Sequence, residues 1–157
     1  ISMVSEMGAE VSQEQEGIRV RGKHLRGREF DLNATPDLLP AMAVLGAFAE
    51  GQTRLLNVPQ ARIKETDRIT AMQKTIEDLG GRAGELPDGL ILEGGGLTGG
   101  KARGFGDHRI VMAAAVAGMA APQGVEVDTA EAIAVTFPDF CARMQHLGVK
   151  IEASETD

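Results

Sequence analysis

Three charged side chains that could carry out chemistry stand close together in the middle of the chain: Lys64, Glu65 and Arg68. A carboxylate can transfer a proton when its neighbours tune its pKa, and cations can bind an anionic ligand. Apolar residues that follow at spacings of three and four predict a helix over residues 64–79, ended by a pair of glycines. Because the helix dipole disfavours cations at an N-terminus, these cations suggest a bound anion. The alternative is a solvated helix start with charge pairs three and four residues apart.

A second charged group, Asp107-His108-Arg109, precedes the longest apolar stretch of the chain. The free N–H groups at the start of such a helix attract anions, and Arg109 adds a planar fork that suits carboxylate or phosphate. The alternative is an aspartate N-cap with a surface histidine and arginine. Asp37 occupies the matching position before the apolar run of residues 38–49, where it could be a base or only an N-cap.

These groups belong to an internal repeat of about 70 residues, a period that indicates a repeated structural unit. Each copy predicts a helix ended by glycine, two short strands, a buried alanine-rich helix, a strand and a second helix. We therefore expect an α/β (α+β) fold of about two pseudo-symmetric repeat units, near residues 9–80 and 81–152. The glycines that align in the two copies are Gly8, Gly17 and Gly22 with Gly80, Gly89 and Gly94.

The two copies differ at the positions of the charged residues. This difference favours a functional role for these residues over a purely structural one. Lys64-Glu65 align with the uncharged Val135-Thr136, and His108-Arg109 align with two leucines. Charges that one copy carries and the other lacks suggest one site assembled from several units. The candidate site residues are Asp37, Lys64, Glu65, Arg68, His108 and Arg109.

Composition narrows the possible partners. A net charge of −7 argues against a polyanion, and the absence of Trp and Tyr argues against base stacking, so nucleic acid binding is not expected. The apolar run of residues 110–122 is too short to span a bilayer, and no signal peptide precedes it. A single cysteine, Cys141, suits a reducing compartment. We therefore expect a cytoplasmic protein without a membrane segment.

The charged motifs resemble those of the 5-enolpyruvylshikimate-3-phosphate synthases, and their order and spacing also agree. The resemblance runs over the whole chain and corresponds to the C-terminal part of a full-length member. The matching motifs are Ile63-Lys64-Glu65-Thr66-Asp67-Arg68-Ile69, Asp107-His108-Arg109-Ile110, Thr136-Phe137-Pro138-Asp139-Phe140, and Pro36-Asp37 before an apolar helix.

The resemblance implies a fold of two lobes, each built of three β-α-β-α-β-β units with pseudo-threefold symmetry, and a site between the lobes. This chain would then be a single partial lobe over residues 1–157, without the N-terminal lobe. The missing N-terminal portion would be its partner. We expect the isolated chain to be inactive and to bind substrates weakly.

The activity implied is that of 3-phosphoshikimate 1-carboxyvinyltransferase, in the shikimate pathway of aromatic amino acid and chorismate biosynthesis. This reaction moves the enolpyruvyl group of phosphoenolpyruvate to the 5-hydroxyl of shikimate 3-phosphate and releases phosphate. By this resemblance Asp37 would accept the hydroxyl proton, and Glu65 would protonate the methylene carbon and later remove a proton. Lys64 would contact shikimate 3-phosphate and the reacting centre. The phosphoenolpyruvate-binding residues would be Arg68, His108 and Arg109. No metal ion and no organic cofactor is implied.

One position departs from the family pattern. Many members have a lysine just before the Thr-Phe-Pro-Asp segment, where this chain has Val135. That lysine helps to bind phosphoenolpyruvate, so its replacement puts substrate affinity and the response to glyphosate in question. Two alternatives stay open: UDP-N-acetylglucosamine enolpyruvyl transferase, which shares the fold, and a noncatalytic assembly half.

Overall fold

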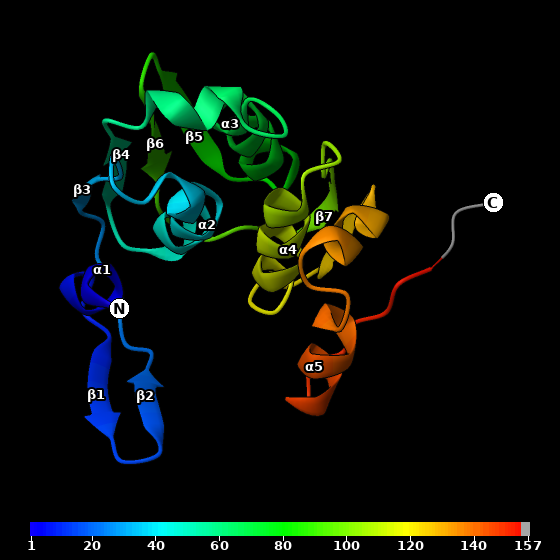
Figure 1. Cartoon of the computed structure of the whole chain (residues 1–157). Helices are drawn as coiled ribbons and strands as arrows, with labels where there is room; N and C mark the ends of the chain where they lie inside the picture. Colours follow the sequence, from blue (N-terminus) through cyan, green and yellow to red (C-terminus); the bar gives the residue numbers. More distant parts are fainter. Residues whose placement is uncertain (155–157) are drawn as a thin grey trace.

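The computed structural model describes residues 1–154, which form a mixed α/β structure (Figure 1). The helices are α1 (Ser2–Glu6), α2 (Leu39–Phe48), α3 (Arg68–Asp78), α4 (His108–Ala117) and α5 (Phe140–His146). The strands are β1 (Glu10–Glu14), β2 (Gly17–Arg21), β3 (Glu29–Asp31), β4 (Gln52–Leu56), β5 (Arg82–Leu86), β6 (Gly89–Glu93), β7 (Gly100–Ala102) and β8 (Val125–Val127). The short 3₁₀ turns are η1 (Pro36–Leu38), η2 (Pro59–Ile63) and η3 (Ala130–Val135).

A four-stranded sheet of order β3-β4-β6-β5 occupies the middle of the chain. β3 runs parallel to β4, whereas β4 and β6 are antiparallel, and β5 and β6 form a hairpin. Residues that alternate along β4 and β6 point to one face, and Leu55, Leu90 and Leu92 are fully buried there. Helices α2 and α3 contact this sheet, so residues 29–93 form one complete β-α-β-α-β-β unit.

Parts of two further units flank this complete one. The antiparallel hairpin β1–β2 corresponds to the end of a unit, and the parallel pair β7–β8 corresponds to the beginning of another. The sequence reading missed β3 and β7 and counted its units from the hairpin instead. The α/β class is confirmed, while the division at residues 9–80 and 81–152 stays a prediction.

The alanine-rich helices α2 and α4 contact each other and place the beginnings of two units side by side. Four of their alanines, Ala43, Ala47, Ala114 and Ala117, are fully buried. A smaller apolar cluster of Val111, Ile133 and Phe140 holds η3 and α5 against α4. None of the helices described for residues 1–154 has both the length and the apolar character needed to cross a membrane.

Helix α3 begins later than the sequence reading expected. The predicted start at Lys64 is wrong by four residues, because Lys64 has an extended backbone and Asp67 caps the helix. The Asp67 carboxylate accepts hydrogen bonds from the backbone N–H groups of Ile69 at 3.1 Å and Thr70 at 3.2 Å. Lys64 and Glu65 therefore lie in the loop before the helix rather than on its first turn.

Candidate active site

The structure brings all six candidate residues into one connected cluster. They come from three places that are distant in sequence: η1, the loop from η2 into α3, and the first turn of α4. Each member lies within 4 Å of at least one other, measured between side-chain nitrogen and oxygen atoms. The members are Asp37, Lys64, Glu65, Arg68, His108 and Arg109.

Asp37 stands at the meeting point of three cations. Its Oδ1 lies 2.8 Å from Arg68 Nη1 and 3.4 Å from Lys64 Nζ, and its Oδ2 lies 3.2 Å from Arg109 Nη2. Partial burial would raise the pKa of Asp37, but the charges of Arg109, Lys64 and Arg68 outweigh that effect and hold the pKa below its ordinary value. Asp37 is therefore a carboxylate at neutral pH. The N-cap positions of η1 and α2 are Thr35 and Leu38, and the Asp37 carboxylate accepts from Arg68 and Arg109 instead, so Asp37 is not an N-cap.

Arg68 is the buried centre of the cluster, with 1% of its surface exposed. Its Nε donates to Asp107 Oδ2 at 2.8 Å, and its Nη2 donates to Glu65 Oε2 at 2.6 Å. Together with Asp37, these carboxylates surround the whole guanidinium. The cluster thus contains three carboxylates and three cations, so Arg68 does not need an external anion to balance its charge at the helix start.

Asp107 has a role that the sequence reading missed. Its Oδ1 caps α4 by accepting from the backbone N–H of Arg109 at 2.9 Å, as expected for an N-cap. The same fully buried carboxylate also binds Arg68. The sequence carried the signal for the cap alone, because the pairing depends on the packing of α3 against α4.

Glu65 is the second partly exposed carboxylate of the cluster, and it lies beside His108. Glu65 Oε1 lies 3.7 Å from Nδ1 of His108, whose side chain is buried. The Glu65 side chain is about half exposed, at 47%. Asp37 is exposed to a similar degree, at 44%, but it contacts three cations, whereas Glu65 contacts Arg68 and the His108 ring. Glu65 and Asp37 therefore occupy different electrostatic surroundings. Two carboxylates in different surroundings can divide the roles of acid and base.

Arg62, which was not a candidate, anchors the loop that carries Lys64 and Glu65. Its guanidinium lies 2.7 Å from Asp67 Oδ2 and 2.8 Å from Glu85 Oε1. It also donates to two backbone carbonyls at the β5–β6 turn, at 2.6 and 2.8 Å. The loop is thereby tied to both the α3 cap and the sheet. In the sequence Arg62 was one more charge in a charged run, and nothing distinguished it.

The start of α4 is held by the segment that follows β8. The backbone N–H of Gly104 donates to Asp128 Oδ1 at 2.6 Å, and that of Gly106 donates to Thr129 Oγ1 at 3.0 Å. Gly106 has a φ of +64°, which favours glycine in the tight turn before Asp107. These contacts fix the direction in which the first turn of α4 presents His108 and Arg109.

Within residues 1–154, no group of three or more His, Cys, Asp or Glu side chains could hold a metal ion.

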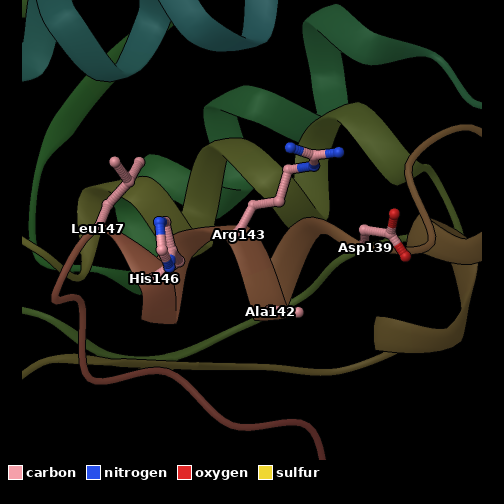
Figure 2. A pocket seen from close by; sticks show the side chains of 5 residues that line it. All are labelled: Asp139, Ala142, Arg143, His146 and Leu147. Atoms are coloured by element: carbon pink, nitrogen blue, oxygen red, sulfur yellow. The ribbon is translucent and has the colours of Figure 1, made fainter.

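A surface hollow lies outside this cluster. It has a volume of about 330 Å³ and runs along one face of α5 (Figure 2). The matching face of α3 packs on the next unit, where Thr75 donates to the Arg103 carbonyl at 3.1 Å. The repeat therefore favours a packing surface over a ligand site. The hollow is lined by Asp139, Ala142, Arg143, His146 and Leu147.

Comparison with known proteins places this chain in a family. A family model described as EPSP synthase (3-phosphoshikimate 1-carboxyvinyltransferase) matches residues 1–155. The chain belongs to the EPSP synthase family. Its resemblance to the enolpyruvyl transferases of that family is thereby confirmed over almost its whole length.

Relatives with this activity in their names are similar over nearly the whole chain. The 3-phosphoshikimate 1-carboxyvinyltransferase of Acetivibrio thermocellus is 51% identical over 98% of this chain and 36% of that protein. The one from Ruminiclostridium cellulolyticum is 47% identical over 97% of this chain and again 36% of that protein. The chain thus spans about a third of the length of these relatives.

Solved structures support the fold. An EPSP synthase from Acinetobacter baumannii superposes with a TM-score of 0.89 at 29% identity, covering 98% of this chain and 39% of that one. The enolpyruvyl transferase NikO from Streptomyces tendae superposes with a TM-score of 0.77 at 22% identity, covering 99% of this chain and 36% of that one. The second likeness concerns the fold alone.

Proposed function

We propose that this chain is the C-terminal catalytic part of a 3-phosphoshikimate 1-carboxyvinyltransferase. The observation that carries the proposal is Asp37, a carboxylate held between Lys64, Arg68 and Arg109 at the meeting of three elements. Such an arrangement suits a reaction that joins two anionic substrates and moves a proton between them. The names of the relatives favour this activity over the transferase that acts on a UDP-linked sugar.

Lys64 and Arg109 are the cations available to an anionic substrate. Both are partly exposed, and within residues 1–154 the ion pairs of each involve Asp37 alone. A bound phosphate or carboxylate would compete with Asp37 for these side chains. Loss of their attraction would raise the pKa of Asp37 from its depressed value and make it a better proton acceptor.

The proposed reaction has an addition and an elimination. In the addition, the 5-hydroxyl oxygen of shikimate 3-phosphate bonds to C2 of phosphoenolpyruvate, and its proton passes to Asp37. Glu65 enters this step as the carboxylic acid and gives its proton to C3. In the elimination, the bond from C2 to the phosphate oxygen breaks, and Glu65 takes a proton back from C3 to restore the double bond. The proton on Asp37 leaves with the departing phosphate.

Arg68 supports this chemistry chiefly through position. It holds Asp37 and Glu65 at the same guanidinium, at 2.8 and 2.6 Å, and so fixes the spacing of the two carboxylates. Phosphoenolpyruvate would bind Arg109, His108 and Arg68. For Arg68 to take part, Asp37 would have to release its Nη1 or Glu65 its Nη2.

The test is complementation with the missing N-terminal portion of the enzyme. The isolated chain should release no phosphate from phosphoenolpyruvate and shikimate 3-phosphate, and activity should appear on mixing. Arg109→Ala should reduce that activity at least tenfold. Arg103→Ala, which removes an exposed arginine paired with Asp78, is the matched control and should leave it unchanged. Normal turnover by the isolated chain, or no turnover by the mixture, would refute the proposal.

A noncatalytic scaffold is separated from this proposal by ligand titration. Phosphoenolpyruvate added to the mixture should shift the side-chain NMR signals of Arg68 and Arg109. A scaffold would show no shift with or without the N-terminal portion. The same titration with glyphosate tests whether Val135, in place of the lysine of many members, weakens inhibitor binding. We also propose the cytoplasmic location that the single cysteine, Cys141, leads us to expect.

A further inference from the structure

The loop of residues 63–66, which carries Lys64 and Glu65, has little of its own to hold it in place. Within residues 1–154, no backbone–backbone hydrogen bond involves residues 64–66. Ile63 is exposed, so the loop also lacks an apolar anchor. A segment with few buried contacts and an open backbone moves easily unless side chains restrain it. The position of Lys64 and Glu65 therefore depends on side-chain contacts.

The ion pairs of Lys64 and Glu65 themselves cannot hold the loop throughout a reaction. Lys64 Nζ lies 3.4 Å from Asp37, and Glu65 Oε2 lies 2.6 Å from Arg68. In the proposed function the same side chains contact substrate or transfer a proton, so these ion pairs must be exchanged during turnover. The loop needs a support whose contacts lie outside the site.

Arg62 provides such a support, because all five of its N–H donors are used outside the site. Nε and Nη2 donate to two backbone carbonyls at 2.8 and 2.6 Å. Nη1 donates to a carboxylate at 2.7 Å and to a hydroxyl at 3.4 Å, and Nη2 lies 2.8 Å from a second carboxylate. None of these partners is a candidate site residue. They are Pro87, Leu86, Asp67, Thr70 and Glu85.

The contact of Arg62 with Asp67 joins the two ends of the loop. Oδ1 of Asp67 caps α3, while Oδ2 accepts from Arg62. Thr70 on the first turn of α3 donates in turn to Glu85 Oε2 at 3.0 Å, and Glu85 also pairs with Arg62. The end of η2, the start of α3 and the β5–β6 hairpin are thereby fixed to one another around a single guanidinium.

The second copy of the repeat has neither this support nor the charges that it holds. η3, the counterpart of η2, has the sequence Ala-Glu-Ala-Ile-Ala-Val and contains no lysine or arginine. Asp139, the counterpart of Asp67, makes no side-chain cap bond. Val135-Thr136 stand where the first copy has Lys64-Glu65. The arginine thus occurs in the copy whose loop carries candidate site residues.

We propose that Arg62 is a positioning residue, which keeps Lys64 and Glu65 in the site after substrates have displaced their present ion pairs. The inference rests on the proposed function, in which Glu65 gives a proton to C3 of phosphoenolpyruvate and later takes one back. A misplacement of about 1 Å by a change outside the reacting groups can cost about a hundredfold in rate. Arg62 therefore acts on kcat without touching a substrate.

The proposed phosphoenolpyruvate cations are held by other contacts. His108 and Arg109 lie on α4, whose start is fixed by Asp128 and Thr129. Arg68 is fixed by the buried carboxylate of Asp107. A change at Arg62 should therefore lower kcat and leave the KM for phosphoenolpyruvate nearly unchanged.

Arg62→Lys is the test variant. Lysine keeps the positive charge beside Asp67 and Glu85, but a compact ammonium with three donors cannot replace a planar fork with five. In the mixture with the N-terminal portion, at saturating shikimate 3-phosphate, kcat per folded chain should fall by about tenfold or more, and the KM for phosphoenolpyruvate should change by less than about threefold. Circular dichroism in the assay buffer gives the folded fraction. An unchanged kcat per folded chain would mean a merely structural role and would overturn the proposal.

Arg82→Lys is the matched control, because it makes the same exchange on β5, the strand that carries Glu85. Arg82 is exposed, and no ion pair among residues 1–154 involves it. This variant should keep the native kcat and KM. Equal losses of kcat in Arg62→Lys and Arg82→Lys would overturn the proposal.

A double-variant cycle tests whether the contact with Asp67 carries the effect. Asp67→Asn keeps an oxygen for the α3 cap but turns an amide donor towards Arg62, so the variant folds while the contact is lost. It should also lower kcat per folded chain. Because the two residues act through one contact, the double variant should be no slower than the slower single variant. Losses that multiply would show that the two residues act independently and would contradict the proposal.

Nuclear magnetic resonance relaxation of the isolated chain gives a readout that does not depend on activity. The backbone order parameters of Lys64 and Glu65 should be near 0.8 in the native chain and in Arg82→Lys, and below about 0.6 in Arg62→Lys. Equal order parameters in the three chains would overturn the proposal. If the native mixture showed no turnover, the proposed function would fail, and the order parameters would still decide whether Arg62 holds the loop.

Discussion

The buried guanidinium of Arg68 decides how the candidate site is organised at the level of single residues. It lies between carboxylates from η1, from the loop between η2 and α3, and from the N-cap of α4, where Asp107 is as deeply buried as Arg68 itself. A buried ion pair adds little net stability compared with an apolar pair, but removing one partner leaves an uncompensated buried charge. The cluster is therefore held in one arrangement by the cost of breaking it.

Replacing Arg68 by alanine should lower the free energy of unfolding by about 3–5 kcal/mol, because Asp107 would lose its partner while staying buried. Urea unfolding followed by circular dichroism measures the change, since the chain has neither Trp nor Tyr for fluorescence. Lys101→Ala serves as the control, because the Lys101–Glu126 pair is largely exposed and should contribute little. Equal losses in the two variants would show that Arg68 is not the centre of the cluster.

The depressed pKa of Asp37 predicts a pH dependence. Burial alone would raise this pKa, but Arg109, Lys64 and Arg68 lower it in the folded chain, so the folded state binds the Asp37 proton less readily than the unfolded state. The stabilisation is fully present above the unfolded pKa of about 3.9 and is lost as the pH falls through the folded value. Asp37→Asn should therefore be less stable than the native chain at pH 7, and the difference should shrink below pH 4. Urea midpoints at both pH values check this, and a difference that grows in acid would contradict it.

At this scale the sequence predicted the members of the cluster better than their contacts. The missing charges at Val135 and Thr136 singled out Lys64 and Glu65, and the structure does bring the candidate residues together. The roles proposed for them stay predictions. The bond between Arg68 and Asp107 could not be predicted, because it joins residues 39 positions apart whose pairing depends on helix packing.

Among the elements, the start of α3 shows where the sequence pattern was misleading. The charged run before Ile69 could be read as a first helical turn, because Lys64 and Arg68 stand four residues apart. The structure gives the cap to Asp67, and Arg62 binds the capping carboxylate and the β5–β6 turn. The cap and its anchor hold Lys64 and Glu65 in a loop, where their side chains reach residues of other elements.

Asp67 and its counterpart in the repeat, Asp139, give a matched test of this cap. Both are N-cap residues, but Asp67 accepts two backbone hydrogen bonds whereas Asp139 makes no side-chain cap bond. Asp67→Ala should cost about 1–2 kcal/mol of stability, and Asp139→Ala should cost much less. Urea unfolding of both variants measures the difference. A larger loss at Asp139 would show that the two capping sites have been assigned the wrong way round.

Two of the three shortest strands were missed for a physical reason. β3 (Glu-Phe-Asp) and β7 (Gly-Lys-Ala) have one apolar side chain each in three residues, so neither repeats the alternation that marks a strand, whereas β8 (Val-Glu-Val) does. β3 and β7 are both parallel partners of a later strand, so only the completed fold reveals their pairing. The hairpins β1–β2 and β5–β6, which are local and bounded by glycines, were predicted correctly.

For the molecule as a whole, apolar side chains beside the candidate site point to a surface that the described chain leaves open. Leu38 follows Asp37 and Ile63 precedes Lys64, and both are exposed. Exposed apolar residues next to a polar cluster mark an interaction surface. Because the chain spans about a third of its relatives, this surface fits the proposal that the N-terminal portion of the enzyme completes the site.

Ile63→Ser separates the stability of the chain from its association with that portion. Ile63 is 84% exposed, so the substitution removes little buried surface and should leave urea unfolding of the isolated chain unchanged. If the N-terminal portion covers Ile63, the same change should weaken its binding about tenfold or more, measured by titration calorimetry or by the concentration needed for activity. Met119→Ser is the control: Met119 is also exposed, but it follows the far end of α4, about 15 Å along the helix from the site. Equal binding by both variants would place the covered surface elsewhere, because a residue adjoining Lys64 cannot stay at its present exposure if the other portion closes over the site.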